Sequence, residues 1–325
     1  MNTRIREKTS LIDHRIGWNR MKKHIDLPKG IFFAIAGITA FLVFVIIGFL
    51  LYTAAPVLEM SGIGFITSSV WDYNTNQYGI FIFLIDTILV TALTLALAVP
   101  VGLLTAMYLA EWAPAWMEKV LRPLVELLVG IPSVVYGFFG LFILSNFFLS
   151  YLNPFVDRVL GFIPIFRNVR PDTHAGLLLT ATILAVMVIP TIVALSQDAM
   201  RGVPDEYREA SIALGATRWE TVRNVVIPSA FPGIVTAVIL AMMRAIGETM
   251  AVVMLMGNVT KIPASIFDVG YPMTAKILND IMYYVAFPEP RAALFGIAVV
   301  IFLLEILAVA GVRLICFWAQ KRSMS

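Results

Sequence analysis

The chain has 325 residues, of which 59% are hydrophobic and only 14% are charged, and its mean hydropathy is +0.86. Soluble globular domains average about 45–50% apolar and about 25% charged residues, so the composition excludes an ordinary soluble domain and indicates a polytopic membrane protein. The single cysteine, Cys316, excludes a disulfide framework within one chain and a cysteine-based metal site, whereas the net charge of +3 is informative only when divided between the two sides of a membrane.

Six apolar segments are long enough to cross a bilayer and are predicted to be membrane-spanning helices. They extend over Ile31–Tyr52, Ile80–Ala110, Leu121–Leu149, Ala175–Gln197, Ser229–Met256 and Ala292–Trp318. Pro100, Pro132 and Pro190 interrupt three of them, and such breaks are tolerated where neighbouring helices satisfy the freed backbone groups. We therefore expect an all-α bundle of six helices, several of them bent.

The basic residues predict the orientation of the chain, because lysine and arginine concentrate on the cytosolic side. The charged segment 1–29 holds eight of them and is too long for the basic region of a signal peptide, so the first helix is expected to be retained. The loop 54–79 holds none. Further basic residues follow helices two, four and six, namely Lys119, Arg122, Arg201, Arg208, Arg218, Arg223, Lys321 and Arg322. Both termini are therefore predicted to be cytosolic. Arg158, Arg167 and Arg170 oppose this orientation, because they lie between helices three and four, on the side that it places outside.

These assignments divide the chain into three parts. Residues 1–29 form a cytosolic basic tail that rests against the lipid bilayer or only anchors the topology. Residues 30–318 form the transmembrane domain, with an external loop at 54–79 and a cytoplasmic loop at 203–224. Residues 319–325 form a cytosolic C-terminal tail.

The loop after the fourth helix is predicted to hold a short helix. Val203-Pro204-Asp205-Glu206 is typical of a helix start, because proline and acidic residues favour the first turn. Gly215 is placed to end this helix, and an amphipathic piece, Thr217–Val226, leads to Pro228 and the fifth helix. A helix of this kind can lie on the lipid interface, but interfacial helices are usually basic and this segment is nearly charge-balanced.

The fifth apolar segment carries two charged residues, Arg244 and Glu248. Arg244 follows Pro228 by roughly 24 Å of helix, which places it near or just beyond the middle of the bilayer. Residues four apart share one helical face, and burying either charge alone costs at least about 2.5–3.5 kcal/mol. The pair is therefore either a self-neutralising brace or part of a pathway for an anion.

The chemistry of the pair favours one kind of anion. A guanidinium offers planar, bidentate donors that suit carboxylate or phosphate. A neighbouring carboxylate repels a fully deprotonated oxyanion but accepts a hydrogen bond from one that keeps a proton, as hydrogen phosphate does at neutral pH and sulfate does not. Gly247 would allow close approach of a ligand or helix, and Thr249 adds a hydroxyl.

Two sets of residues carry a resemblance to a known family. Glu209-Ala210-Ser211, three residues, Gly215, nine residues and Val225-Val226-Ile227-Pro228 resemble the EAA loop of ABC importer permeases, with Ser211 in place of the second alanine. In that family the loop is a coupling helix seated in a groove of the ATP-binding subunit. The resemblance implies ATPase-coupling roles for Glu209, Ala210 and Gly215, together with Asp205 and Arg208 in the same segment.

The second set, MMRAIGETMAVVMLMGN, resembles the fifth-helix signature of phosphate ABC importer permeases of the PstC type. FITSSVWDYNTNQYG, AVPVGLLTAMYLAEWAP and ELLVGIPSVVYGFFGLF add matches, so that the resemblance covers about residues 60–315. It departs from the family at Asp86, where glycine is common. The resemblance implies a type I ABC importer permease (MetI-like) fold with Arg244 and Glu248 in the path of inorganic phosphate.

The resemblance also implies partners in a prokaryotic cytoplasmic (inner) membrane. These are a second homologous permease subunit, two cytosolic ATP-binding subunits, and an extracytoplasmic phosphate-binding protein that contacts loops such as 54–79. The chain has no GxxxxGK[ST] sequence, so ATP hydrolysis is expected in a separate chain, with no cofactor in this one. No nucleic-acid partner is expected.

Several alternatives stay open. Within the same class, one alternative is a permease for another oxyanion, such as sulfate, molybdate or a phosphonate. In a different class, the alternative is a stand-alone anion channel or secondary transporter. A membrane enzyme lacks support, because no nucleophile–base pair is visible and His14, His24 and His174 are too scattered for a metal site. The intramembrane acids Asp86, Glu126 and Glu305 are expected to reach interfacial water or to pair locally, and their roles are open.

Overall fold

The computed structural model describes residues 3–167 and 174–323, and it describes side chains at 29–167, 174–314, 316 and 317. Arg170 and the side chains of Lys321, Arg322 and the basic residues before Lys29 therefore lie outside the described residues. The described backbone is mainly helical, with one small antiparallel sheet. This confirms the all-α class.

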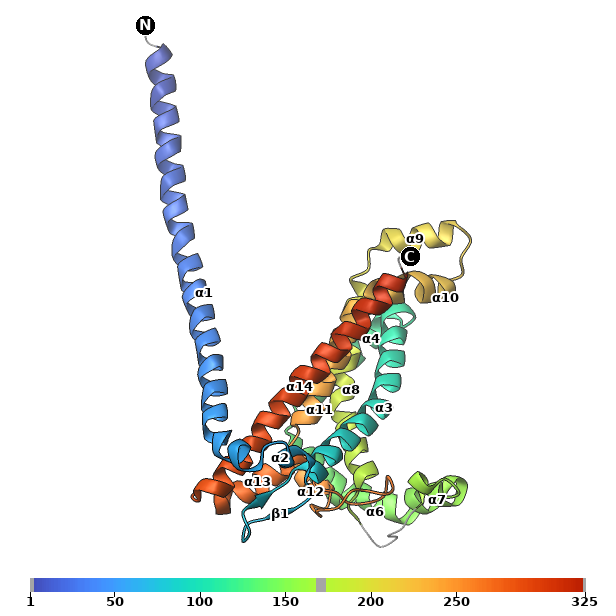
Figure 1. Cartoon of the computed structure of the whole chain (residues 1–325). Coiled ribbons are helices and arrows are strands. Elements are labelled where there is room, and N and C mark those ends of the chain that lie inside the picture. The colour runs from blue at the N-terminus through green and yellow to red at the C-terminus, as the bar shows by residue number, and fades with distance from the viewer. Residues whose placement is uncertain (1–2, 168–173, 324–325) are drawn as a thin grey trace. The chain divides into compact units, whose positions relative to one another are not determined.

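The elements are given in chain order and labelled in Figure 1 where there is room. The helices are α1 (Thr3–Ser61), α2 (Gly64–Thr67), α3 (Phe81–Glu111), α4 (Ala115–Val129), α5 (Ser133–Phe139), α6 (Ser145–Phe147), α7 (Asn153–Leu160), α8 (Leu177–Arg201), α9 (Asp205–Ala213), α10 (Arg218–Thr221), α11 (Ile227–Gly247), α12 (Met250–Leu255), α13 (Met273–Tyr284) and α14 (Pro288–Ser323). The strands are β1 (Trp71–Asp72) and β2 (Gln77–Tyr78). Short π-helical turns are η1 (Gly140–Leu144), η2 (Phe148–Leu152) and η4 (Val222–Val226), and η3 (Pro164–Phe166) is a 3-10 turn.

Six helical stretches of the described chain are long and apolar enough to cross a membrane, as predicted. They are Lys29–Ser61, Phe81–Glu111, Ser133–Leu160, Leu177–Arg201, Arg218–Gly247 and Pro288–Leu314. The first extends well beyond its predicted end at Tyr52, because the helix continues to Ser61.

The predicted third span, Leu121–Leu149, was wrong. The helix that contains Leu121 ends at Val129, and the span begins at Ser133. Pro132 separates them, because proline lacks the amide hydrogen that a helix interior needs and disfavours helical geometry at the residue before it. Residues 115–129 therefore form a separate helix, α4, which packs on α8.

The chain divides into two compact units, Met1–Thr53 and Ala54–Ser325. The described part of the first unit is one continuous helix, the beginning of α1. In the second unit α8 lies at the centre and packs against α3 and α11. Gly102 of α3 permits close approach, because a β-carbon there would come within 2.7 Å of Cγ2 of Ile192 on α8.

The two ends of the second unit differ in structure. Figure 1 shows α9 and α10 at one end, near the end of α14, and β1, α12 and α13 at the opposite end. The charged loop and the small sheet therefore lie on opposite sides of the helical bundle. This separation is what a loop on each side of a membrane requires.

Asp86 joins the start of α3 to the chain segment between α12 and α13. It is fully buried, which corrects the expectation that this acid reaches interfacial water. Its Oδ2 accepts a hydrogen bond of 2.5 Å from the amide of Tyr271, and Oγ1 of the adjacent Thr87 accepts one of 3.0 Å from the amide of Met273. Asp86 therefore fixes a long-range backbone contact.

Replacing Asp86 by leucine is expected to destabilise the protein by about 1–3 kcal/mol, because the buried amide of Tyr271 loses its acceptor. Thermal unfolding of the purified protein in detergent measures this. Asp86→Asn keeps an acceptor and is expected to lose less. A leucine variant that unfolds at the wild-type temperature would contradict the assignment.

Candidate functional site

The fifth span is interrupted inside its conspicuous sequence. Helix α11 ends at Gly247, and Glu248 has an extended backbone with φ −67° and ψ 129°. A new helix, α12, begins at Met250. The prediction that Arg244 and Glu248 share one helical face was therefore wrong, since Glu248 lies beyond the helix end. Gly247 and Thr249 both have low helix propensity, which is consistent with a break at this point.

Hydrogen bonds hold the broken segment. One carboxylate oxygen of Glu248, Oε1, accepts from the amide of Ala251 at 3.3 Å, and its backbone carbonyl accepts from Oγ1 of Thr274 at 2.9 Å. Thr249 donates its hydroxyl to the carbonyl of Gly247 at 3.2 Å. The second carboxylate oxygen of Glu248 accepts no hydrogen bond from any described residue.

Arg244 lies in the last turn of α11 and is partly buried. It forms no ion pair or hydrogen bond with any residue that the structure describes. Tyr136 of α5 is near enough for the charge of Arg244 to act on its hydroxyl, which itself donates to the carbonyl of Leu128 at 2.9 Å. A self-neutralising pair with Glu248 is not formed. An unpaired guanidinium in an apolar span is costly and calls for a ligand or water.

Glu305 of α14 is a further charged residue beside the break. Its Oε1 lies 3.8 Å from the position that a β-carbon on Gly247 would take, and it has no hydrogen-bond partner among the described residues. No role was assigned to Glu305 from the sequence, although an acidic residue inside an apolar span itself indicates a functional site. Glu126, by contrast, pairs locally with Arg122 at 3.1 Å, as expected.

An apolar cavity of about 230 Å³ lies nearby between α3, α11 and α14. Its lining includes Ile88, Leu95, Met242 and Leu304 but not Arg244. Apolar walls cannot replace the hydration of an anion. The cavity is therefore not the candidate anion site.

The charged loop at the other end forms the predicted short helix, α9, with Asp205 and Glu206 in its first turn. Gly215 follows with φ +89°, a conformation that glycine adopts without strain. Thr217 then caps α10: its hydroxyl accepts from the amide of Glu220 at 3.3 Å, and the Glu220 carboxylate accepts from the amide of Thr217 at 2.7 Å. The loop is thus two short helices joined by a tight turn.

Arg208 fastens this loop to the transmembrane helices. Its guanidinium contacts the Glu111 carboxylate at the end of α3 at 3.1 Å and donates to the carbonyl of Met200 at 2.9 Å and to that of Val203. Arg218 donates to the backbone carbonyl of Glu111. The side chain of Arg208 is 19% exposed, so it faces inward rather than toward a docking partner.

The remaining predicted coupling residues are exposed. Asp205, Glu209, Ala210 and Gly215 all lie on the surface of the loop. Large apolar side chains are exposed beside them, namely Tyr207, Ile212, Leu214 and Trp219. Apolar side chains on a charged loop are typical of a surface that another protein covers.

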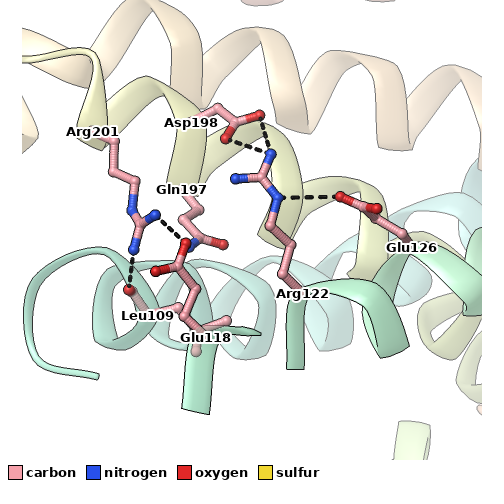
Figure 2. Close-up of polar contacts among 7 residues, drawn as sticks. All are labelled: Leu109, Glu118, Arg122, Glu126, Gln197, Asp198 and Arg201. Carbon is pink, nitrogen blue, oxygen red and sulfur yellow. Dashed lines mark hydrogen bonds and ion pairs between the residues drawn. The ribbon is translucent and has the colours of Figure 1, made fainter. Parts of the chain in front are cut away.

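A charged cluster near the same end joins α4 to α8 (Figure 2). Its charged members are Glu118, Arg122, Glu126, Asp198 and Arg201, and the Gln197 amide and the backbone carbonyl of Leu109 bond to them. Arg122 pairs with Glu126 and, at 3.2 Å, with Asp198, while Arg201 pairs with Glu118 and holds the pKa of that carboxyl below its usual range. Exposed ion pairs contribute little stability individually, so the cluster mainly fixes the position of α4.

The structure thus brings the predicted residues together in two groups. Arg244, Gly247, Glu248 and Thr249 lie at the break between α11 and α12, and the coupling residues lie in the loop at the other end. Six apolar spans, a broken fifth helix and a braced loop between spans four and five define a multi-pass membrane protein.

Comparison with known proteins identifies the family. Residues 98–320 match the family described as binding-protein-dependent transport system inner membrane component, and the chain belongs to that family. It is therefore an ABC importer permease subunit of the inner membrane and not an enzyme, with the type I (MetI-like) permease fold.

Relatives agree over most of the chain. It is 38% identical over 256 residues to the probable ABC transporter permease protein YqgH of Bacillus subtilis (strain 168), with 78% of this chain and 77% of that protein aligned. It is 33% identical over 297 residues to the phosphate transport system permease protein PstC of Mesorhizobium japonicum, with 90% of each chain aligned. Among solved structures, a bacterial ABC transporter involved in the import of the acidic polysaccharide alginate matches with a TM-score of 0.52 and 18% identity over 85% of this chain and 94% of the other.

Proposed function

We propose that this permease subunit carries inorganic phosphate in an ATP-driven importer. Two observations at the helix break carry the proposal, both made among the described residues. The guanidinium of Arg244 has no partner there, and one carboxylate oxygen of Glu248, in the unwound segment one turn later, also has none. Relatives named as phosphate transport permeases support the same cargo.

The broken helix gives each residue a chemical role. Arg244 binds two phosphate oxygens with its planar donors. The unpaired oxygen of Glu248 accepts a hydrogen bond from the hydroxyl that hydrogen phosphate retains, and it repels sulfate, which has no such hydroxyl. Thr249 and the exposed backbone at Gly247 are additional polar groups beside the ion.

The loop at the other end supplies the coupling to ATP. In this proposal, Glu209, Ala210 and the turn at Gly215 contact an ATP-binding subunit in the cytosol, on the side where both chain termini lie. A second permease subunit completes the pathway, two ATP-binding subunits drive it, and an extracytoplasmic phosphate-binding protein contacts the surface around 54–79. Arg208 positions the loop through Glu111, and Asp205 adds an exposed ion pair to Arg208.

The test of the anion assignment is Glu248→Gln. The variant complex, reconstituted in proteoliposomes, is expected to lose at least tenfold of its preference for phosphate over sulfate in ATP-dependent uptake, because the neutral amide no longer repels the sulfate dianion. Glu126→Gln is the matched control, since Glu126 pairs with Arg122 within α4, a helix separate from α11 and α12. An unchanged preference in the Glu248 variant rejects the assignment.

The alternative classes give different results in the same assay. Uptake that proceeds without any ATP-binding subunit indicates a channel or secondary transporter. Stimulation of ATP hydrolysis by a binding protein loaded with sulfate, molybdate or a phosphonate, but not with phosphate, identifies a different oxyanion.

A further inference from the structure

Lys276 of α13 lies in an aromatic cage that the proposed transport chemistry does not use. It is 7% exposed, and its Nζ lies 4.9 Å from the ring centroid of Trp71, 5.5 Å from Tyr73, and 5.3 Å from both Phe83 and Tyr271. Cation–π contacts are strongest when the ammonium is removed from water, as it is here. Burial lowers the pKa of Lys276, and the neighbouring Asp280 carboxylate, which stabilises the ammonium, opposes that shift.

The cage attaches the small sheet to α13. Asp280, one turn after Lys276, lies 2.6 Å from its Nζ and accepts a hydrogen bond from the Tyr73 hydroxyl. Tyr73 also stacks on Tyr284 of α13, with ring centroids 3.7 Å apart. A hairpin with two residues in each strand is not stable alone. Its position therefore depends on these contacts with α13.

The same first turn of α13 also contacts the broken fifth span. Thr274, two residues before Lys276, donates its hydroxyl to the carbonyl of Glu248 at 2.9 Å. Residues two apart on a helix point in nearly opposite directions. One face of α13 therefore holds the hairpin while the other holds Glu248, and Figure 1 shows β1, α12 and α13 at the same end of the unit.

We propose that α13 is a rigid link that transmits displacement of the hairpin at residues 71–78 to the unwound segment at Glu248, with Lys276 and Thr274 as its two positioning residues. The inference rests on the proposed function in one respect: the partner that displaces the hairpin is the extracytoplasmic binding protein. Docking there moves α13 as a body, and the Thr274 hydroxyl carries the movement to the backbone beside the anion site.

Hydrogen–deuterium exchange of the purified complex in lipid nanodiscs tests the link without any substrate. Lys276→Met is expected to speed exchange at least threefold in both segments 71–78 and 247–253. Thr274→Val is expected to speed exchange in 247–253 alone. Lys261→Met is the matched control, because it removes a different ion pair, with the buried Asp268 at 2.8 Å, and should leave both segments unchanged.

A second, milder variant guards against general unfolding of Lys276→Met. Tyr73→Phe removes only the hydroxyl that bonds Asp280 and is expected to produce the same joint change on a smaller scale. For either variant, faster exchange in segment 71–78 with an unchanged exchange rate in segment 247–253 overturns the link.

The functional readout separates this proposal from the proposed cargo. In the wild-type complex, the phosphate-loaded binding protein should stimulate ATP hydrolysis, and Thr274→Val should lose at least fivefold of that stimulation. Retained stimulation overturns the link. Absence of phosphate uptake by the wild-type complex overturns the cargo, whereas the exchange measurements still decide the link.

Discussion

Replacing Arg244 by glutamine is expected to reduce ATP-dependent phosphate uptake by about 100-fold. The substitution removes both the positive charge of Arg244 and its planar pair of hydrogen-bond donors. Losing charged hydrogen bonds of this kind costs about 3 kcal/mol. The guanidinium forms no ion pair with any described residue, so glutamine leaves no buried partner charge behind. Protein stability should therefore be retained. Uptake of radiolabelled phosphate into proteoliposomes measures the effect.

Two controls make the result specific. Arg244→Lys keeps the charge but loses the planar fork, and it should show an intermediate rate. Arg223→Gln removes an exposed arginine near the coupling loop and should leave uptake within about twofold of wild type. Wild-type uptake by the Arg244→Gln complex would show that this residue does not handle the anion.

Replacing Arg208 by methionine is expected to disrupt coupling by displacing the cytoplasmic loop. The Glu111 side chain is only 8% exposed, and removing one partner of such a buried pair costs about 3 kcal/mol or more. The carbonyls of Met200 and Val203 lose a donor as well. Uptake should fall at least tenfold, and less ATP-binding subunit should copurify with the membrane complex.

A double substitution distinguishes a role of Arg208 in positioning the cytoplasmic loop from a direct contact with the ATP-binding subunit. Glu111→Leu combined with Arg208→Met removes both charges and keeps apolar volume, so it should restore much of the stability that Arg208→Met loses. Asp205→Asn alters an ion-pair partner of Arg208 that is 87% exposed and should have little effect. If Arg208→Met keeps full coupling, the loop does not depend on this brace.

Hydropathy and local signals were sufficient for the spans and for α9. Long apolar runs predict membrane helices directly, and the acidic first turn and Gly215 marked the ends of a short helix in the right place. The error in the third span came from averaging hydropathy across Pro132, although proline is itself the signal for a break.

The parts that could not be predicted depend on contacts between residues distant in sequence. The unwound backbone at Glu248 is held by Thr274, and Arg208 reaches Glu111, 97 residues away. The cage around Lys276 takes two of its rings from Trp71 and Phe83. None of these pairings has a local periodicity. Helical spacing therefore placed Glu248 on the same helical face as Arg244, and the family resemblance gave Arg208 a coupling role without its contact to Glu111.

The central position of α8 has a consequence for how this sequence can vary. In the most apolar stretch of α8, 67% of residues are buried within the described structure, against 28% to 39% in the other spans of the second unit. A span that faces lipid on one side accepts exchanges among leucine, isoleucine, valine and phenylalanine there, because lipid adapts to their shape. On α8 each such exchange changes volume inside close packing. In a saturation library selected for growth, α8 should therefore tolerate the fewest apolar substitutions. Its packing then limits how far the sequence of the whole bundle can change.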